Sequence, residues 1–208
     1  MYQRHLIAYK EAAKIVSGTV LEVGSGEGYG IMELAPITEK YIAVDKYDTH
    51  ISNELKGEND ITFIQTEVPP LKGIDDDSVD YIYTSHALEH VPWFQSDFAL
   101  SECYRVLKIG GLIEIHVPDF EYIVKCYNER KIGDHWIKYN NREHHTAWAA
   151  SRIFTHGPTF SNYHKSCWDK EYLEYCLIKN NFRDISLCDG GRARVYHGVI
   201  NLGMQACK

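Results

Sequence analysis

The chain has 208 residues, 44% of them hydrophobic and 25% charged, with a formal net charge of −7. This composition is typical of a globular protein long enough to bury one core, so we expect a single domain over residues 1–208. The acidic balance disfavours a nucleic-acid substrate, because negative surfaces repel phosphate groups.

Cysteine spacing and hydropathy argue against three further classes. The six cysteines include no C-x-x-C pair, so neither a disulfide framework nor a zinc knuckle is expected. No run of about 18 apolar residues suggests a membrane span, and the first five residues lack the apolar run of a signal peptide. We therefore expect a cytoplasmic protein, with its oligomeric state left open.

The first 118 residues alternate between expected helices and strands. Apolar residues at helical spacing predict helices over 5–16, from residue 29 to 34 and over 94–107, with a stop at 108–111. Short, nearly all-apolar runs predict a parallel sheet that is covered on both faces. These expected strands are 19–23, 41–45, 61–64, 78–84 and 112–117.

The rest of the chain breaks this rhythm. Helices are expected over 119–131 and 169–180, and between them residues 132–168 read as an irregular, lid-like insertion over the carboxyl end of the sheet. Two late strands, 182–187 and 194–206, flank a Gly-Gly turn, which predicts an antiparallel hairpin.

A glycine-rich loop follows the first expected strand, where residues 21–28 read LEVGSGEG. Glycines at this position let the backbone pass close to a ligand. Asp45 lies 23 positions after Glu22 (45 − 22), at the end of the next strand, where a carboxylate can accept hydrogen bonds from ribose hydroxyls. The pattern predicts a nucleoside-bearing cofactor.

Two alternatives compete with this interpretation: a plain tight turn and a dinucleotide-binding site. The dinucleotide fingerprint G-x-G-x-x-G needs a third glycine, but the three possible registers place Tyr29, Ile31 or Glu33 there. An acid at Glu22 would also sit poorly beside a pyrophosphate. It suits a ligand with positive charge, such as an amino group and a sulfonium.

Three segments and one acid, in order, make the chain resemble class I S-adenosylmethionine-dependent methyltransferases. Residues 20–30 resemble the first motif of that family, and Asp45 matches its ribose-binding acid. Residues 76–91 resemble the fourth-strand motif, and 105–112 (RVLKIGGL) resemble its RVLKPGG turn, with Ile109 in place of proline. The resemblance covers roughly residues 5–118.

The resemblance implies an α/β, Rossmann-like, doubly wound sheet of seven strands with an antiparallel last strand and helices on both faces. It also implies that Glu22, Gly24 and Gly26 border the methionine part of the cofactor, while Asp45 binds the ribose. Two more residues of the glycine motif are assigned to the same cofactor site: Ser25 and Tyr29.

Four further residues are assigned to the cofactor by the same resemblance. The family places an acid after the third strand against the adenine amino group, and Glu67 is the nearest acid here. At the end of the fourth strand, Thr84, Ser85 and His86 would line the cofactor's edge.

Candidate general bases lie past the fourth and fifth strands. A base helps when the acceptor must lose a proton, and histidine is suited to this near neutral pH. His86 and His90 are the first candidates, and His116 and Asp119 bracket the end of the fifth strand. Each has another interpretation: His86 as a pocket wall, His90 as a helix-packing residue and Asp119 as a helix cap.

The insertion is rich in histidine and tryptophan. Such a density of histidines can indicate a metal site, but no carboxylate or cysteine pattern of known ligand spacing accompanies these residues. No metal is therefore predicted, and an aromatic lid over the acceptor is favoured. The residues concerned are His135, Trp136, His144, His145, Trp148, His156 and His164.

Residues 154–165 and 181–185 resemble the tail of the small bacterial "methyltransferase type 11" group, with Asn181 in place of a glycine. Members often accompany sugar or cell-surface polysaccharide genes. The sequence thus predicts methyl transfer from S-adenosylmethionine to oxygen or nitrogen of a small or medium acceptor, with a glycan precursor as one option. An NAD(P)-binding oxidoreductase and a non-catalytic cofactor-binding module remain the alternatives.

Overall fold

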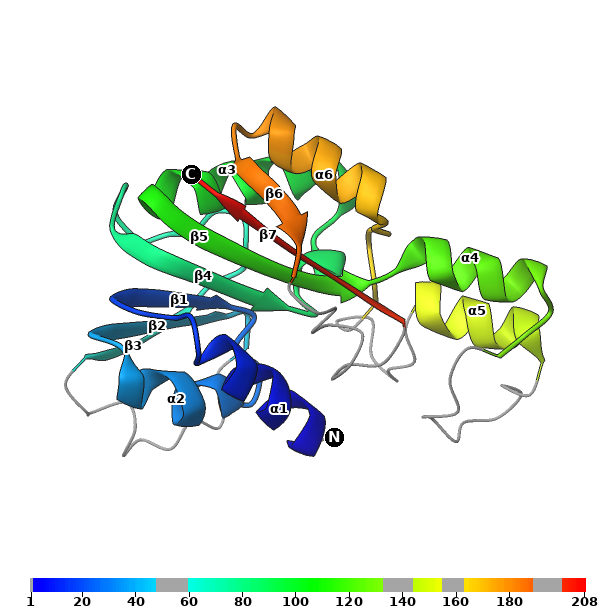
Figure 1. Ribbon diagram of the computed structural model, residues 1–208, viewed down its shortest axis with the longest axis horizontal. Coiled ribbons are helices and arrows are strands. Elements are labelled where there is room, and N and C mark those ends of the chain that lie inside the picture. The colour runs from blue at the N-terminus through cyan, green and yellow to red at the C-terminus, as the bar shows by residue number, and fades with distance from the viewer. Residues whose placement is uncertain (1, 48–59, 133–143, 155–162, 189–199) are drawn as a thin grey trace.

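The computed structural model describes residues 2–47, 60–132, 144–154, 163–188 and 200–208. Seven strands form one sheet in the order β3-β2-β1-β4-β5-β7-β6 (Figure 1). The first five strands run parallel, and β7 lies antiparallel between β5 and β6, as expected. The strands are β1 (Thr19–Val23), β2 (Lys40–Asp45), β3 (Ile61–Gln65), β4 (Val79–Ser85), β5 (Leu107–Pro118), β6 (Arg183–Leu187) and β7 (Asn201–Cys207).

Helices cover both faces of this sheet (Figure 1), as expected. Two of them, α1 and α2, pack on one face, and α3 and α6 pack on the other. No helix in the described ranges is both long and apolar enough to span a bilayer. The α-helices are α1 (Tyr2–Ala12), α2 (Tyr29–Leu34), α3 (Ser96–Val106), α4 (Phe120–Asn128), α5 (His145–Ile153) and α6 (Lys170–Lys179).

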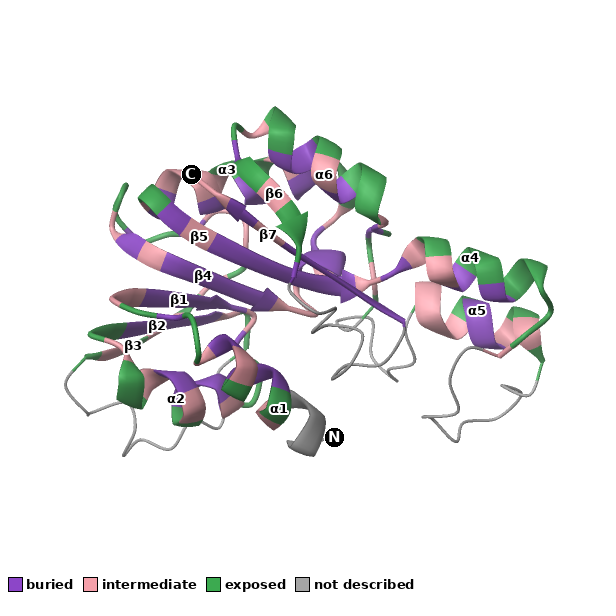
Figure 2. Cartoon of the chain, in the orientation of Figure 1, coloured by how far each residue is buried: buried purple, intermediate pink, exposed green. Residues whose placement is uncertain are grey.

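Burial follows position in the sheet (Figure 2). The central strands β1, β4, β5 and β7 are mostly buried, whereas the edge strands β3 and β6 are mostly partly or fully exposed. This explains the apolar runs, because a central parallel strand needs apolar side chains on both faces.

The expectation that residues 132–168 are irregular is wrong over α5. Trp148 and Ala149 of this helix are buried, and they pack against Ile123 and Cys126 of α4. The pair α4–α5 lies beyond the carboxyl end of β5 (Figure 1). Packing against α4 stabilises this short helix, since a nine-residue helix is marginal by itself.

Strand β5 begins five residues before its expected start. Helix α3 ends at Val106, one residue before its expected end, and the glycine pair at 110–111 lies within β5, at an irregularity of the pairing with β4. Val79 pairs with Leu107 and Tyr81 pairs with Leu112. Between these two pairs β5 has more residues than β4, and the extra residues of β5 form a bulge. The Gly-Gly turn between the last two strands lies outside the described residues.

Candidate functional site

A cavity of about 570 Å³ opens at the carboxyl ends of the parallel strands. It lies where the strand order reverses, between β1 and β4, which is where open α/β sheets bind their ligands. Its volume is typical of a small-molecule site. Its wall is formed by the ends of β1, β2 and β4, by the segment that follows β3 and by the apolar face of α3.

The glycine loop forms one wall of this cavity through Gly24 and Gly26. Gly24 has φ +80, and its N–H donates to the carbonyl oxygen of Val44 at 2.8 Å. A Cβ on Gly24 would lie 2.4 Å from the Cβ of Ala87, in the segment after β4. Glycine at position 24 therefore lets the loop after β1 and the segment after β4 meet at the cavity.

Asp45 lies at the end of β2 and lines the same cavity. Its two carboxylate oxygens accept hydrogen bonds from the backbone N–H groups of Gly26 and Tyr47, each at 2.9 Å. These bonds orient the carboxylate. Each oxygen can accept a second bond, so two ribose hydroxyls can still be bound.

Glu67 and Thr84 also line the cavity. Glu67 pairs with Lys46 at 2.8 Å, and the hydrogen bond from Lys46 lowers the pKa of Glu67. Both side chains of this pair are largely exposed, so the pair contributes little to stability. Lys46 was not among the residues expected at the site, although it directly follows Asp45.

Glu22 is buried, and it is not among the residues that line the cavity. Its neighbours Leu21 and Val23 face the α3 side, so alternation turns Glu22 toward α1 and α2. There it accepts hydrogen bonds from the hydroxyls of Tyr9 and Tyr41. Burial raises the pKa of Glu22 to about 7, although those two hydrogen bonds oppose the rise.

We expect Glu22→Gln to remove part of the pH dependence of stability. The folded carboxyl keeps its proton up to about pH 7, whereas the unfolded one releases it near its ordinary pKa of 4.5. The folded state thus binds more protons in this window, so the stabilisation is complete below about pH 4.5 and is lost as the pH rises through 7. The loss amounts to about 3 kcal/mol.

Urea unfolding of wild type and Glu22→Gln at about pH 5 and about pH 8 measures this effect. The wild type should lose about 3 kcal/mol more than the variant between the two conditions. Groups common to both proteins cancel in this comparison. Parallel pH profiles would show that Glu22 does not titrate in this range.

Three other residues assigned to the cofactor, Ser25, Tyr29 and Ser85, do not line the cavity. Ser25 is buried in the loop, and Tyr29 begins α2. Ser85 ends β4, one residue after Thr84, and therefore belongs to the opposite side of the strand. The loop motif thus includes both lining residues and residues that pack behind them.

His86 and His90 line the cavity. His86 has φ +56, and its Nδ1 lies 3.1 Å from Oε1 of the buried Glu89. Burial favours a raised pKa for Glu89, but the hydrogen bond from His86 and the nearby imidazoles outweigh burial and lower it. Glu89 was missed as a site residue, although it stands three positions after His86, the spacing of neighbours on a helical turn.

His116 and Asp119 lie elsewhere and do not line the cavity. His116 is buried in β5, where its Nε2 lies 2.6 Å from Oε1 of Glu114. Asp119 caps α4 by accepting a hydrogen bond from the N–H of Tyr122 at 3.2 Å. The cap interpretation of Asp119 is confirmed.

The His-rich insertion is placed only in part. His144 and His145 stand at the start of α5, and Trp148 is buried against α4. In the described part of the insertion, Lys165 is the residue that reaches the cavity wall, and its neighbour His164 lies beside Glu89. Burial lowers the pKa of His164. The positions of His135, Trp136 and His156 lie outside the described residues.

Sequence comparison matches residues 21–115 to the family described as "Methyltransferase domain". A probable S-adenosylmethionine-dependent methyltransferase of Mycobacterium tuberculosis is 32% identical over 119 residues, which are 57% of this chain and 42% of that protein. A protein of the same description from Mycolicibacterium smegmatis is 32% identical over 57% of this chain and 45% of its own length. The chain spans less than half the length of these curated relatives.

Solved structures agree on the fold. The 1,6-didemethyltoxoflavin-N1-methyltransferase of Burkholderia thailandensis, bound to 1,6-didemethyltoxoflavin and S-adenosylhomocysteine, superposes with a TM-score of 0.64 at 17% identity, over 100% of this chain and 78% of that chain. A SAM-dependent methyltransferase from Archaeoglobus fulgidus gives 0.60 at 18% identity, over 99% and 94%. At such identities the likeness shows the fold alone.

Proposed function

We propose that this chain is a class I S-adenosylmethionine-dependent methyltransferase that transfers a methyl group to oxygen or nitrogen of a small or medium-sized acceptor. The observation that carries the proposal is the cavity at the β1/β4 reversal. There the glycine loop, Asp45 and two histidines line a cavity of about 570 Å³. A nucleoside and a small acceptor need this combination of groups.

The residues of the cavity fit this cofactor in their chemistry. Gly24 and Gly26 leave room for the methionine part, and the oriented carboxylate of Asp45 suits the ribose hydroxyls. Glu67 can accept from the adenine amino group, while Val68 and Leu100 supply apolar lining for a purine. Glu22 lies behind the loop, so we assign it to loop positioning instead of direct contact.

S-adenosylmethionine supplies an activated methyl group on a sulfonium. The protein must align the acceptor with that carbon and exclude water. As the acceptor's oxygen or nitrogen bonds to the methyl carbon, the sulfur–carbon bond breaks and its electron pair stays on sulfur. The acceptor's proton must then leave. We assign its removal to His86, which Glu89 orients through Nδ1 so that Nε2 can accept the proton.

Isothermal titration calorimetry of the full chain tests the proposal. We expect heat with S-adenosylmethionine and with S-adenosylhomocysteine, and none with NAD or NADP. Heat with a dinucleotide alone would favour the oxidoreductase alternative instead. Binding of S-adenosylmethionine without methyl transfer to any hydroxyl or amine acceptor of a broad panel, sugar precursors included, would favour the non-catalytic module.

A further inference from the structure

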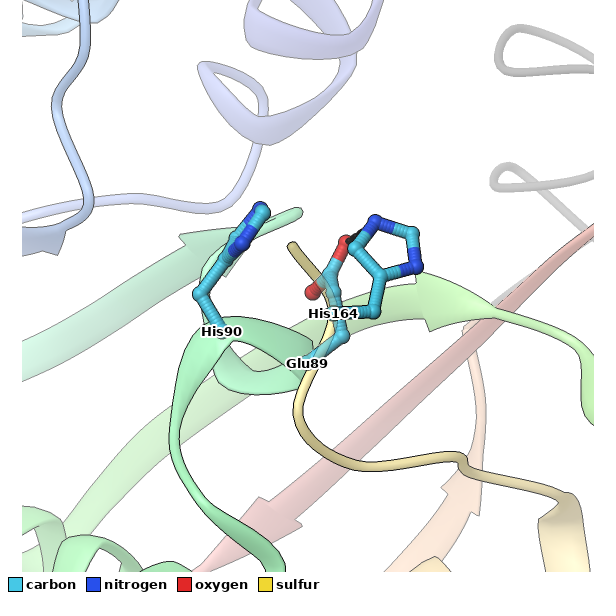
Figure 3. Close-up of side chains that lie close together, drawn as sticks. All are labelled: Glu89, His90 and His164. Carbon is cyan, nitrogen blue, oxygen red and sulfur yellow. Dashed lines mark ion pairs between the residues drawn. The ribbon is translucent and has the colours of Figure 1, made fainter. Parts of the chain in front are cut away.

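Glu89, His90 and His164 converge from two separate parts of the chain (Figure 3). One ligand atom from each of the three side chains lies within 4.8 Å of the other two. Glu89 and His90 belong to the short 3-10 helix η3 (Leu88–His90) after β4, and His164 lies in the segment that leads to α6. Figure 3 shows the Glu89 carboxylate between the two imidazole rings.

Backbone hydrogen bonds hold these two segments together. The N–H groups of Lys165 and Ser166 donate to the carbonyl oxygen of Glu89, at 2.7 and 3.2 Å. The Ser166 hydroxyl also donates to the carbonyl oxygen of Leu88 at 3.2 Å. The cluster is therefore preformed by main-chain contacts and does not depend on long, mobile side chains.

Among the described residues, one oxygen of the Glu89 carboxylate has no hydrogen-bond donor. The side chain is 1% exposed, and Oε1 is occupied by His86 at 3.1 Å. Oε2 is buried, and no hydrogen-bond donor in the described ranges reaches it. A buried, unpaired carboxylate oxygen is costly, so a positive charge at this place would be stabilising.

Both histidines have their Nδ1 atoms engaged with backbone carbonyl oxygens. Nδ1 of His164 lies 3.1 Å from the carbonyl oxygen of Arg152, and Nδ1 of His90 lies 3.2 Å from that of Tyr163. A ring that donates from Nδ1 carries its lone pair on Nε2, and Nε2 of His164 is the atom 4.0 Å from Glu89 Oε1. Metal-binding histidines are commonly oriented by this kind of second hydrogen bond.

We propose that Glu89, His90 and His164 bind a divalent transition-metal ion. Two imidazoles and one carboxylate suit Zn²⁺, Mn²⁺, Fe²⁺ or Co²⁺, whereas Mg²⁺ prefers oxygen ligands and water. Ligands of a tetrahedral zinc lie roughly 3.3 Å apart. The 4.0 Å between Nε2 of His164 and Oε1 of Glu89, within a cluster whose three ligand atoms lie within 4.8 Å of one another, thus requires the ligands to move closer together on metal binding.

Three protein ligands leave at least one coordination position open, which is typical of catalytic and not structural metal sites. His90 lines the main cavity, whereas Glu89 and His164 border a small second pocket behind it. An ion here would stand at the cavity wall, where its open position can hold an acceptor hydroxyl and lower its pKa. This role of the ion, unlike the binding itself, rests on the proposed function.

Cobalt titration of the metal-stripped full chain tests the site without any activity assay. We expect visible d–d absorption bands that saturate at one Co²⁺ per chain and are bleached by Zn²⁺. His164→Ala and Glu89→Gln should each weaken Co²⁺ binding more than 100-fold, since loss of an outer-shell partner alone costs 10–100-fold. The control is the double variant His144→Ala/His145→Ala. It removes two imidazole rings at the start of α5, whose centroids lie 4.3 Å apart. This variant should bind Co²⁺ like wild type.

Absence of the bands in the wild type, or their loss only in the α5 double variant, would overturn the proposal. The three side chains would then form a hydrogen-bonded network without metal. S-adenosylhomocysteine calorimetry on His164→Ala separates this outcome from a failure of the proposed function. That variant should keep wild-type cofactor affinity, because His164 does not line the main cavity.

Discussion

Asp45→Ala is expected to weaken binding of S-adenosylhomocysteine by roughly 30- to 1,000-fold. The substitution removes the carboxylate proposed to accept two ribose hydroxyls, and hydrogen bonds to a charged group contribute about 1.5–3 kcal/mol each. Asp45 is partly exposed, so a total of about 2–4 kcal/mol is expected, which corresponds to the stated fold-change. Calorimetry at constant salt measures the affinity directly.

Two variants make this prediction specific. Asp75→Ala removes an exposed acid before β4 that does not line the cavity, and its affinity should equal that of wild type. Asp45→Asn keeps one oxygen as an acceptor for Gly26 or Tyr47 but loses the charge, so its affinity should lie between the two. If all three variants bind like wild type, the cofactor does not use the end of β2. Thermal denaturation without ligand checks that each variant is folded.

Gly24→Ala is expected to destabilise the protein by about 2–5 kcal/mol and to impair cofactor binding. Alanine at φ +80 costs about 1–2 kcal/mol, and its Cβ would overlap the Cβ of Ala87, 2.4 Å away. Such overpacking typically costs a further 1–3 kcal/mol. Relief of the overlap would also push apart the loop after β1 and the segment after β4, which both border the cavity. Urea unfolding of the variant and the wild type measures the lost free energy of unfolding, provided that both proteins give the same m-value.

Gly110→Ala separates the two contributions. Gly110 has the same φ of +80°, but no atom of the described residues lies within 4 Å of a Cβ built there. We therefore expect this variant to lose only about 1–2 kcal/mol. Equal losses at positions 24 and 110 would mean that the contact with Ala87 relaxes freely and that backbone strain alone makes glycine necessary.

The site was predictable where its residues lie at or just after the end of a strand. The loop at Gly24 and Gly26 follows β1 directly, and Asp45 ends the next strand, so the parallel order alone brings them to one edge of the sheet. His86 and His90 follow β4 for the same reason. Each of these positions depends on a strand end, which apolar runs identify well.

The direction of a side chain was harder to predict than its position. Glu22 stands in the motif beside the glycines, but alternation along β1 turns it away from the cavity and toward Tyr9 and Tyr41. Its neighbours Leu21 and Val23 pack on the α3 side, and adjacent residues of a strand face opposite sides of the sheet. The motif therefore combines residues of two kinds, some at the cavity and some behind it.

The sequence by itself determined the sheet, its antiparallel last strand and the cavity edge, because these follow from local patterns of apolar residues and glycine. Tertiary structure decided what depends on chain segments that meet only after folding. Helix α5 exists because Trp148 packs on α4, and Glu89 meets His164, 75 positions later (164 − 89), because main-chain hydrogen bonds join their segments. Such contacts have no period or spacing in the sequence, so only the folded chain brings the carboxylate and both imidazoles together.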